Sequence, residues 1–195
     1  MNTVRLSRTA AIVCIAITAC AVLYAAAVAL TGWEPSLGYL AQAVIHLGEL
    51  AAVIALALSS AAGNGWLARI GLGAAMLGQV LLVAAELIHP SSPDIGDQMF
   101  NVGPPLSAIG LLLAGVAVIR SRRWTSWHRF TPLVAGAYVF VVLIPVLIVS
   151  GAPPAPSAVW AIAGWEVCWM LIGISVLAVG PITAGAPSRA AVTSG

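Results

Sequence analysis

The chain consists of long apolar stretches separated by short connections that are rich in proline, glycine and polar residues. Each apolar stretch is close to the roughly 20 residues that an α-helix needs to cross the hydrocarbon core of a bilayer. A transmembrane β-strand is only about 10 residues long and alternates in polarity, so the lengths favour helices. The pattern predicts six membrane-spanning helices, at approximately residues 10–32, 37–60, 66–89, 102–120, 131–150 and 157–180.

The composition agrees with this assignment. Of the 195 residues, 61% are hydrophobic and only 7% are charged. A soluble domain needs about 25% charged residues to cover its surface, so most of this surface must face lipid. The short connections leave little chain for a soluble domain. We therefore expect an all-α, polytopic integral membrane protein in which residues 1–195 form a single bundle of six transmembrane helices.

The charged residues predict the orientation of the bundle. The chain has no lysine, and with a cytoplasmic N-terminus all eight arginines fall on the cytoplasmic side, as the positive-inside rule requires. Both termini are then cytoplasmic, and we expect the protein in the inner membrane of the cell. The segment HPSSPDIGDQMFNVGPP (89–105), which carries Asp94 and Asp97, is expected to be an outer loop. Because the arginines mark topology, the net charge of +2 does not indicate a nucleic-acid partner.

One face of the second predicted helix is polar. Tyr39, Gln42, His46 and Glu49 are spaced three, four and three residues apart, so on an α-helix they share one side. The opposite side consists of leucine, alanine, valine and isoleucine. The polar stripe therefore runs from the outer surface to near the middle of the membrane.

A second stripe follows on the third helix, where Gln79, Glu86 and His89 are spaced seven and three residues apart, and the last helix adds Glu166. Every ionisable side chain within a predicted span thus lies at or outside the middle of the membrane. A charged group at the centre of a transmembrane helix costs about 2.5–3.5 kcal/mol on insertion scales. These groups must therefore pair with one another, bind a proton, or face water.

Two interpretations of the stripes need no cofactor. In the first, the polar groups hold helices together by hydrogen bonds. In the second, which we favour, they line a water-filled pocket that opens to the outside and binds or transports a small solute, a cation or a proton. Glu49, Glu166 and His46 would form its core. The full set of candidate ligand-binding residues is Glu49, His46, Glu166, Gln42, Gln79, Glu86 and Tyr39.

A third interpretation is a membrane redox protein or enzyme that holds a metal ion or haem. His46 with Glu49, and Glu86 with His89, resemble the inward-facing carboxylate and histidine ligands of helix-bundle di-metal sites, and Glu166 would add a fifth ligand. Helix rise places the two pairs about 10 Å or more apart in depth. One cluster would therefore need a markedly tilted helix, and haem held by His46 and His89 meets the same objection.

No motif names a catalytic residue. The chain has no P-loop glycine pattern and no H-E-x-x-H, G-x-S-x-G or C-x-x-C motif. A non-catalytic subunit or scaffold, with a membrane protein as its partner, is therefore a further alternative. The basic inner loop 120–130 is a candidate for binding anionic lipid head groups, through Arg120, Arg122, Arg123 and Arg129.

The predicted size and topology carry one resemblance. Six helices in about 190 residues, an inside N-terminus and an outward polar pocket resemble the substrate-binding subunits of energy-coupling-factor vitamin transporters. No sequence motif supports the resemblance, so it implies a bundle with an outward pocket and assigns no ligand to any residue.

Overall fold

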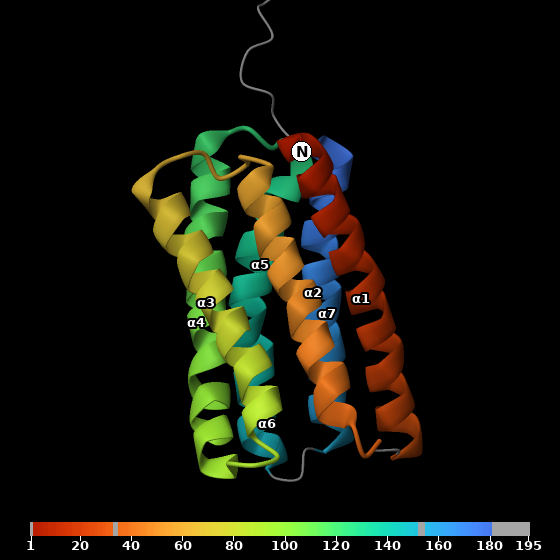
Figure 1. Ribbon diagram of the computed structural model, residues 1–195. Helices are drawn as coiled ribbons and strands as arrows, with labels where there is room; N and C mark the ends of the chain where they lie inside the picture. Colours follow the sequence, from red (N-terminus) through yellow and green to blue (C-terminus); the bar gives the residue numbers. More distant parts are fainter. Residues whose placement is uncertain (1, 33–34, 152–154, 181–195) are drawn as a thin grey trace, which may run out of the picture.

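The protein is a bundle of long helices, seen here in a computed structural model that describes residues 2–32, 35–151 and 155–180 (Figure 1). Within these ranges the chain is helical and contains no strand. The fifth membrane-length helical segment consists of several parts. A 3-10 turn at Ser126–Phe130 precedes α5, and a π-helical turn at Val139–Leu143 joins α5 to α6. The α-helices are α1 (Thr3–Thr31), α2 (Gly38–Leu58), α3 (Trp66–Ile88), α4 (Pro93–Ser121), α5 (Thr131–Tyr138), α6 (Ile144–Ser150) and α7 (Pro156–Val179).

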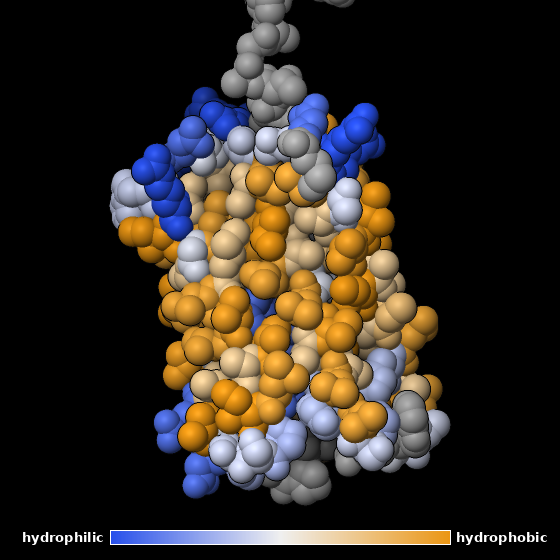
Figure 2. Space-filling model, viewed as in Figure 1, coloured by the Kyte–Doolittle hydropathy of each residue, from blue (hydrophilic) through white to orange (hydrophobic). Residues whose placement is uncertain are grey.

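Six helical units in the described chain, counting Ser126–Ser150 as one, are long and apolar enough to cross a bilayer. The prediction of an all-helical chain with six apolar spans is confirmed, and the architecture is compatible with a multi-pass integral membrane protein. Figure 2 shows the expected surface, a broad apolar band with hydrophilic residues at both ends. Large apolar side chains such as Leu23, Val141 and Ile148 are more than two-thirds exposed in this band, where lipid would cover them.

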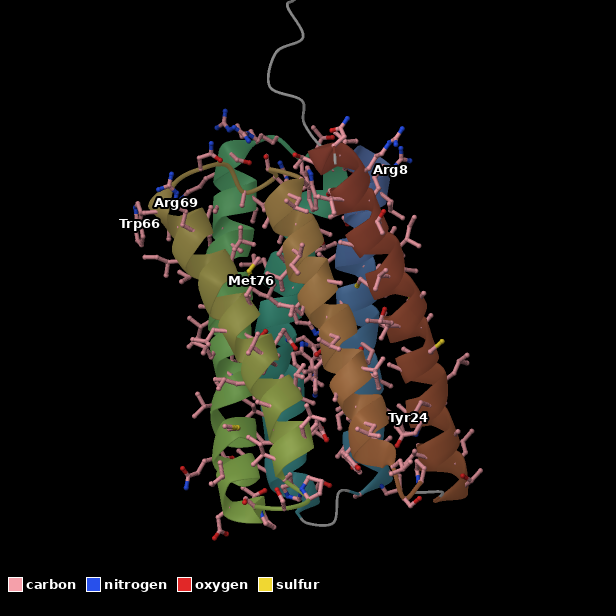
Figure 3. The ribbon with its side chains drawn as sticks, in the orientation of Figure 1. Arg8, Tyr24, Trp66, Arg69 and Met76 are labelled. Atoms are coloured by element: carbon pink, nitrogen blue, oxygen red, sulfur yellow. The ribbon has the colours of Figure 1, made fainter. Side chains whose placement is uncertain are left out.

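The two ends of the bundle differ in charge. Figure 3 shows Arg8, Trp66 and Arg69 at one end and Tyr24 towards the other. We call the first the basic end; it contains the start of α1, the turn 59–65 and the segment 122–130. The opposite end contains the turn 89–92, with Asp94 and Asp97 in the first turns of α4.

The start of α4 corrects the sequence analysis. The segment 89–105 was expected to be a loop, but α4 begins at Pro93 and continues through Pro104 and Pro105. Proline suits the first turn of a helix, because the N–H that it lacks would have no partner there. The added turns pack back onto α3, since a Cβ at Gly96 would lie 2.7 Å from the His89 side chain.

Glycines bring α3 and α4 into close contact. A Cβ at Gly71 would lie 2.6 Å from the Ala114 backbone nitrogen, and one at Gly78 would lie 2.6 Å from that of Ser107. Small residues allow backbones to approach in this way in lipid-embedded bundles. In Figure 1, α3 runs obliquely across α4, so that its lower end lies towards α2.

The fifth span is irregular at its proline. Pro145 has no N–H to donate to the preceding turn and its ring crowds that turn, which breaks regular α-helical bonding. The π-helical turn Val139–Leu143 lies directly before it, where the helix accommodates the lost bond.

Helices α1 and α7 are clamped together towards the basic end. A Cβ at Gly173 would lie 2.9 Å from the Ile15 side chain, and the Cys14 thiol donates to the Trp169 carbonyl at 3.5 Å. Ala11 is fully buried beside this contact. The opposite half of α1 has a different environment, because it borders the cavity described below.

Candidate functional site

A histidine–carboxylate pair lies inside the bundle on α2. The two atoms His46 Nδ1 and Glu49 Oε2 are 2.5 Å apart, and the Glu49 side chain is completely buried. The three-residue spacing places both groups on the same face, one helical turn apart. A carboxylate removed from water needs such a partner, since its desolvation is otherwise strongly unfavourable.

Glu86 on α3 joins this pair. Its Oε1 atom lies 3.8 Å from His46 Nε2, so the imidazole stands between two carboxyl groups from two helices. Helix rise alone predicted a depth difference of about 10 Å between the pairs; the oblique path of α3 removes it for Glu86 (Figure 1). Only a protonated imidazole has an N–H facing each acid.

Glu166 on α7 completes a cluster of four, which we call the acid–imidazole cluster: His46, Glu49, Glu86 and Glu166. The carboxyl of Glu166 lies within electrostatic reach of that of Glu49. Glu49 Oε1 and Glu166 Oε2 are both buried and have no hydrogen-bond donor among the described residues. A single proton held between the two carboxyl groups would supply that donor, because a protonated carboxyl donates and a carboxylate only accepts.

A cavity of about 430 Å³ reaches this cluster from the opposite end, between α1, α2 and α7. Its wall includes Gly32 and Pro156 near the helix ends and Glu166 at depth. Ten residues separate Pro156 from Glu166, which corresponds to about 15 Å along α7. The described residues that line it are Ala21, Tyr24, Ala25, Val28, Ala29, Gly32, Pro35, Gly38, Gln42, Ile45, Pro156, Val159, Ile162 and Glu166.

The other residues of the polar stripes lie in different places. Gln42 lines the cavity, whereas Tyr39 is partly exposed near the start of α2 and is not among the described lining residues. Gln79 is buried between α3 and α4, where its Nε2 donates to the Ser107 hydroxyl at 3.0 Å. Gln79 therefore links helices, as the packing interpretation supposed, and lies apart from the cavity lining.

His89 is separate from the cluster. Its Nε2 lies 3.3 Å from Asp97 Oδ1 at the opposite end, and its ring stands against Phe100 with centroids 5.8 Å apart. Among the described residues, no three histidine, cysteine or acidic side chains form a group arranged to hold a metal ion. His46, Glu49 and Glu86 meet, but the structure does not bring His89 to them. The metal or haem alternative stays a prediction.

The arginines proposed to bind lipid have varied contacts at the basic end. Arg123 Nη1 donates to the Ser60 carbonyl at 2.7 Å, and the Arg129 guanidinium lies 4.7 Å from the centre of the Phe130 ring. Arg120 and Arg122 are exposed. The Arg123 bond connects segment 122–130 to the turn after α2, and lipid binding by the four arginines stays a prediction.

Helix α1 also contributes to the site, which was not predicted from the sequence. Tyr24, Ala25 and Val28 form one wall of the cavity, and a Cβ at Gly38 would lie 3.3 Å from the Tyr24 hydroxyl. A signal was present, because Tyr24 is the one aromatic residue in an otherwise aliphatic and small first span. Its neighbour Ala25 and the nearby Ala21 and Ala29 keep that side of α1 narrow, which leaves the space open.

The site thus combines a mostly apolar cavity with a buried acid at its inner wall and a chain of proton-binding groups behind that acid. Such a site can bind a small solute of matching polarity and respond to it by gaining or losing a proton. No family model matches the chain, and comparisons with curated proteins and with solved structures find no similar protein.

Proposed function

We propose that the protein is an integral membrane protein that binds a small solute in the cavity between α1, α2 and α7, with Glu166 as the polar anchor. In this proposal the basic end faces the cytoplasm, as the arginines favour, so the cavity opens to the outside of the inner membrane. Its volume of about 430 Å³ lies within the range of about 300–1,000 Å³ that is typical of small-molecule sites.

One observation carries the proposal: Glu166 is 98% buried, lines the cavity, and has a carboxyl oxygen without a hydrogen-bond donor among the described residues. Buried polar atoms in proteins almost always have a partner, and an exception calls for an explanation. A proton shared with Glu49 would supply the donor of this covered oxygen, and a polar group of a bound solute would pair with Glu166 on the side that lines the cavity. Packing alone would not require an open space beside the acid.

The test uses two aromatic solutes, the neutral benzyl alcohol and the cationic benzyltrimethylammonium, with the full chain in lipid nanodiscs. We expect at least one of them to bind, and we expect a Val28→Trp variant to lose that binding, because the indole would occupy the cavity. Binding is measured by ligand-observed NMR.

The matched control is Leu23→Trp, which places the same side chain on the outer face of α1, where Leu23 is 71% exposed. This variant should bind like the parent protein. Equal binding by the parent and by Val28→Trp would show that the solute lies elsewhere, and the proposal would fail.

A further inference from the structure

We propose that the solute is a monovalent organic cation that exchanges for a proton at Glu166, and that the displaced proton leaves through Glu49, His46 and Glu86. This inference rests on the proposed function and names its ligand class and its coupled ion. Three features carry it: the composition of the cavity wall, the missing donor between two carboxyl groups, and the path of acids from the cavity to α3.

The cavity wall selects a cation with an apolar body. Glu166 is the acid among the described lining residues, and no arginine, lysine or histidine is found with it there. Apolar side chains such as Val28, Ile45 and Val159 surround the space. Calcium takes about 6–8 oxygen ligands and magnesium keeps an octahedral shell, which this wall does not provide. A single charge on an apolar body matches one carboxylate in apolar surroundings.

A proton is the counter-ion that the two carboxyl groups require when no cation is bound. Glu49 and Glu166 lie within electrostatic reach of each other, and each has a buried oxygen without a donor among the described residues. His46 and Glu86 face Glu49 from α2 and α3, while the thiols of Cys14 on α1 and Cys168 on α7 lie within electrostatic reach of the acids. Among these described neighbours, His46 is the one basic group, and it already serves two acids.

The exchange balances in atoms and charge. When the organic cation enters, the O–H bond held by the Glu49–Glu166 pair breaks, the carboxylate pairs with the cation, and one proton leaves. No electron is transferred and no covalent bond to the solute forms. The net charge of the buried site is the same before and after, so the exchange avoids the cost of adding an unpaired charge inside the bundle.

A separate exit for the proton follows from the geometry, because the bound solute fills the cavity above Glu166. Glu49 Oε2 is 2.5 Å from His46 Nδ1, and His46 Nε2 is 3.8 Å from Glu86 Oε1. Imidazole passes a proton by accepting at one nitrogen and releasing from the other. Glu86 lies only two residues before the last residue of α3, about 3 Å along the helix axis.

The surface agrees with an exit between α2 and α3. The Glu86 side chain is 15% exposed and that of His46 is 11% exposed, whereas Glu49 is fully covered. A proton reaching Glu86 therefore arrives at the surface near the opposite end.

The first experiment counts protons. Benzyltrimethylammonium has no acidic N–H proton, so any proton released on its binding comes from the protein. With the full chain in nanodiscs and a pH indicator in weak buffer, we expect about one proton per bound cation. Benzyl alcohol should bind without releasing any. Glu166→Gln should weaken cation binding by about thirtyfold or more and retain the alcohol.

The second experiment times the release by stopped flow. Glu86→Gln should release the same number of protons but about a hundredfold more slowly, which is the usual scale for a positioned proton-transfer group. Asp97→Asn is the matched control, since it removes an acid from the same end outside the chain of groups, and it should leave the rate unchanged.

Each failure points to a different part of the inference. Cation binding without proton release overturns the exchange but leaves solute binding intact. Binding of the alcohol but not of the cation overturns the ligand class. An unchanged release rate in Glu86→Gln overturns the exit route. Binding of neither solute, or binding that survives Val28→Trp, removes the proposed function itself.

Discussion

At the scale of single residues, the bundle keeps its buried acids in place by giving each a different kind of support. Glu49 has the closest partner, because His46 Nδ1 lies 2.5 Å away. Glu86 has a longer contact to the same imidazole and some access to the surface. Glu166 has no contact to the imidazole, and its neighbours are Glu49 and the cavity. The acid that lines the cavity is therefore the one with the fewest partners within the protein.

The histidine–acid pair gives the first prediction. His46→Leu should lower the free energy of unfolding by about 3 kcal/mol, because it leaves Glu49 buried without a donor. The double variant His46→Leu, Glu49→Leu should recover most of this loss, since two apolar groups need no partner. Unfolding in mixed SDS micelles measures both. If the single and double variants are equally destabilised, the pair does not stabilise the protein in this way.

The polar residues that share one face of a helix were predictable from their spacing. Which of them meet residues of other helices was not. The His46–Glu49 pair follows from helical periodicity, and the structure contains it. Gln79 and Glu86, seven residues apart, seemed to belong to one stripe, yet Gln79 bonds Ser107 on α4 and Glu86 reaches His46 on α2. The oblique path of α3 separates them, and the crossing of helices depends on packing that periodicity does not contain.

At the scale of elements, the contact between α3 and α4 depends on the absence of side chains. Gly71→Ala should destabilise the protein by about 1–3 kcal/mol, the usual effect of overpacking, because its Cβ would lie 2.6 Å from the Ala114 nitrogen. Gly73→Ala is the matched control two residues away, where nothing lies within 4 Å of the new Cβ.

The control should be neutral or up to about 1 kcal/mol more stable, since alanine is the better helix former. Thermal unfolding in detergent, followed by circular dichroism, distinguishes the two variants. Equal stabilities would show that α3 and α4 are not held at this distance in the membrane protein.

The number of apolar helices was predictable because it depends on length and composition, but their ends were not. Polar residues and prolines marked 93–105 as a loop, and the structure extends α4 through them from Pro93. Gly96 allows these turns to lie against His89, directly after the end of α3, and this contact across the turn is not local to α4. In a local sequence pattern, proline indicates the end of a helix. A contact that stabilises the helix in spite of its prolines cannot be recognised from such a pattern.

At the scale of the whole molecule, charge divides the bundle into a basic end and an end with the cavity and the buried acids. If the basic end is cytoplasmic, a cysteine at position 91 should react with an impermeant maleimide added outside intact cells. A cysteine at position 64 should react only after the membrane is opened. Ser91→Cys and Asn64→Cys are both at exposed turn positions, so they form a matched pair. The reverse labelling pattern would invert the proposed orientation.

A pocket lined by the polar stripes was expected from the sequence, but the shape and the mostly apolar wall of the cavity were not. The sequence placed polar groups in one half of the predicted membrane, and the structure shows the cavity reaching two of the residues expected there, Gln42 and Glu166. Its third wall comes from alanines and Tyr24 on α1, which periodicity marks only as a small, apolar helix. The cavity forms because three helices do not pack closely against one another at this level. The sequence of a single helix does not predict such a gap.

The attachment of α1 to α7 has a mechanical consequence. Near the basic end the two helices are locked by Gly173 and the Cys14–Trp169 contact, while beyond Ala21 the same helix borders open space. The outer part of α1 is thus attached to α7 through the half of the helix near the basic end. If the cavity binds a solute as proposed, a solute too bulky for it would have to displace the outer part of α1, and the stiffness of this alanine-rich helix would then limit the size of the solute.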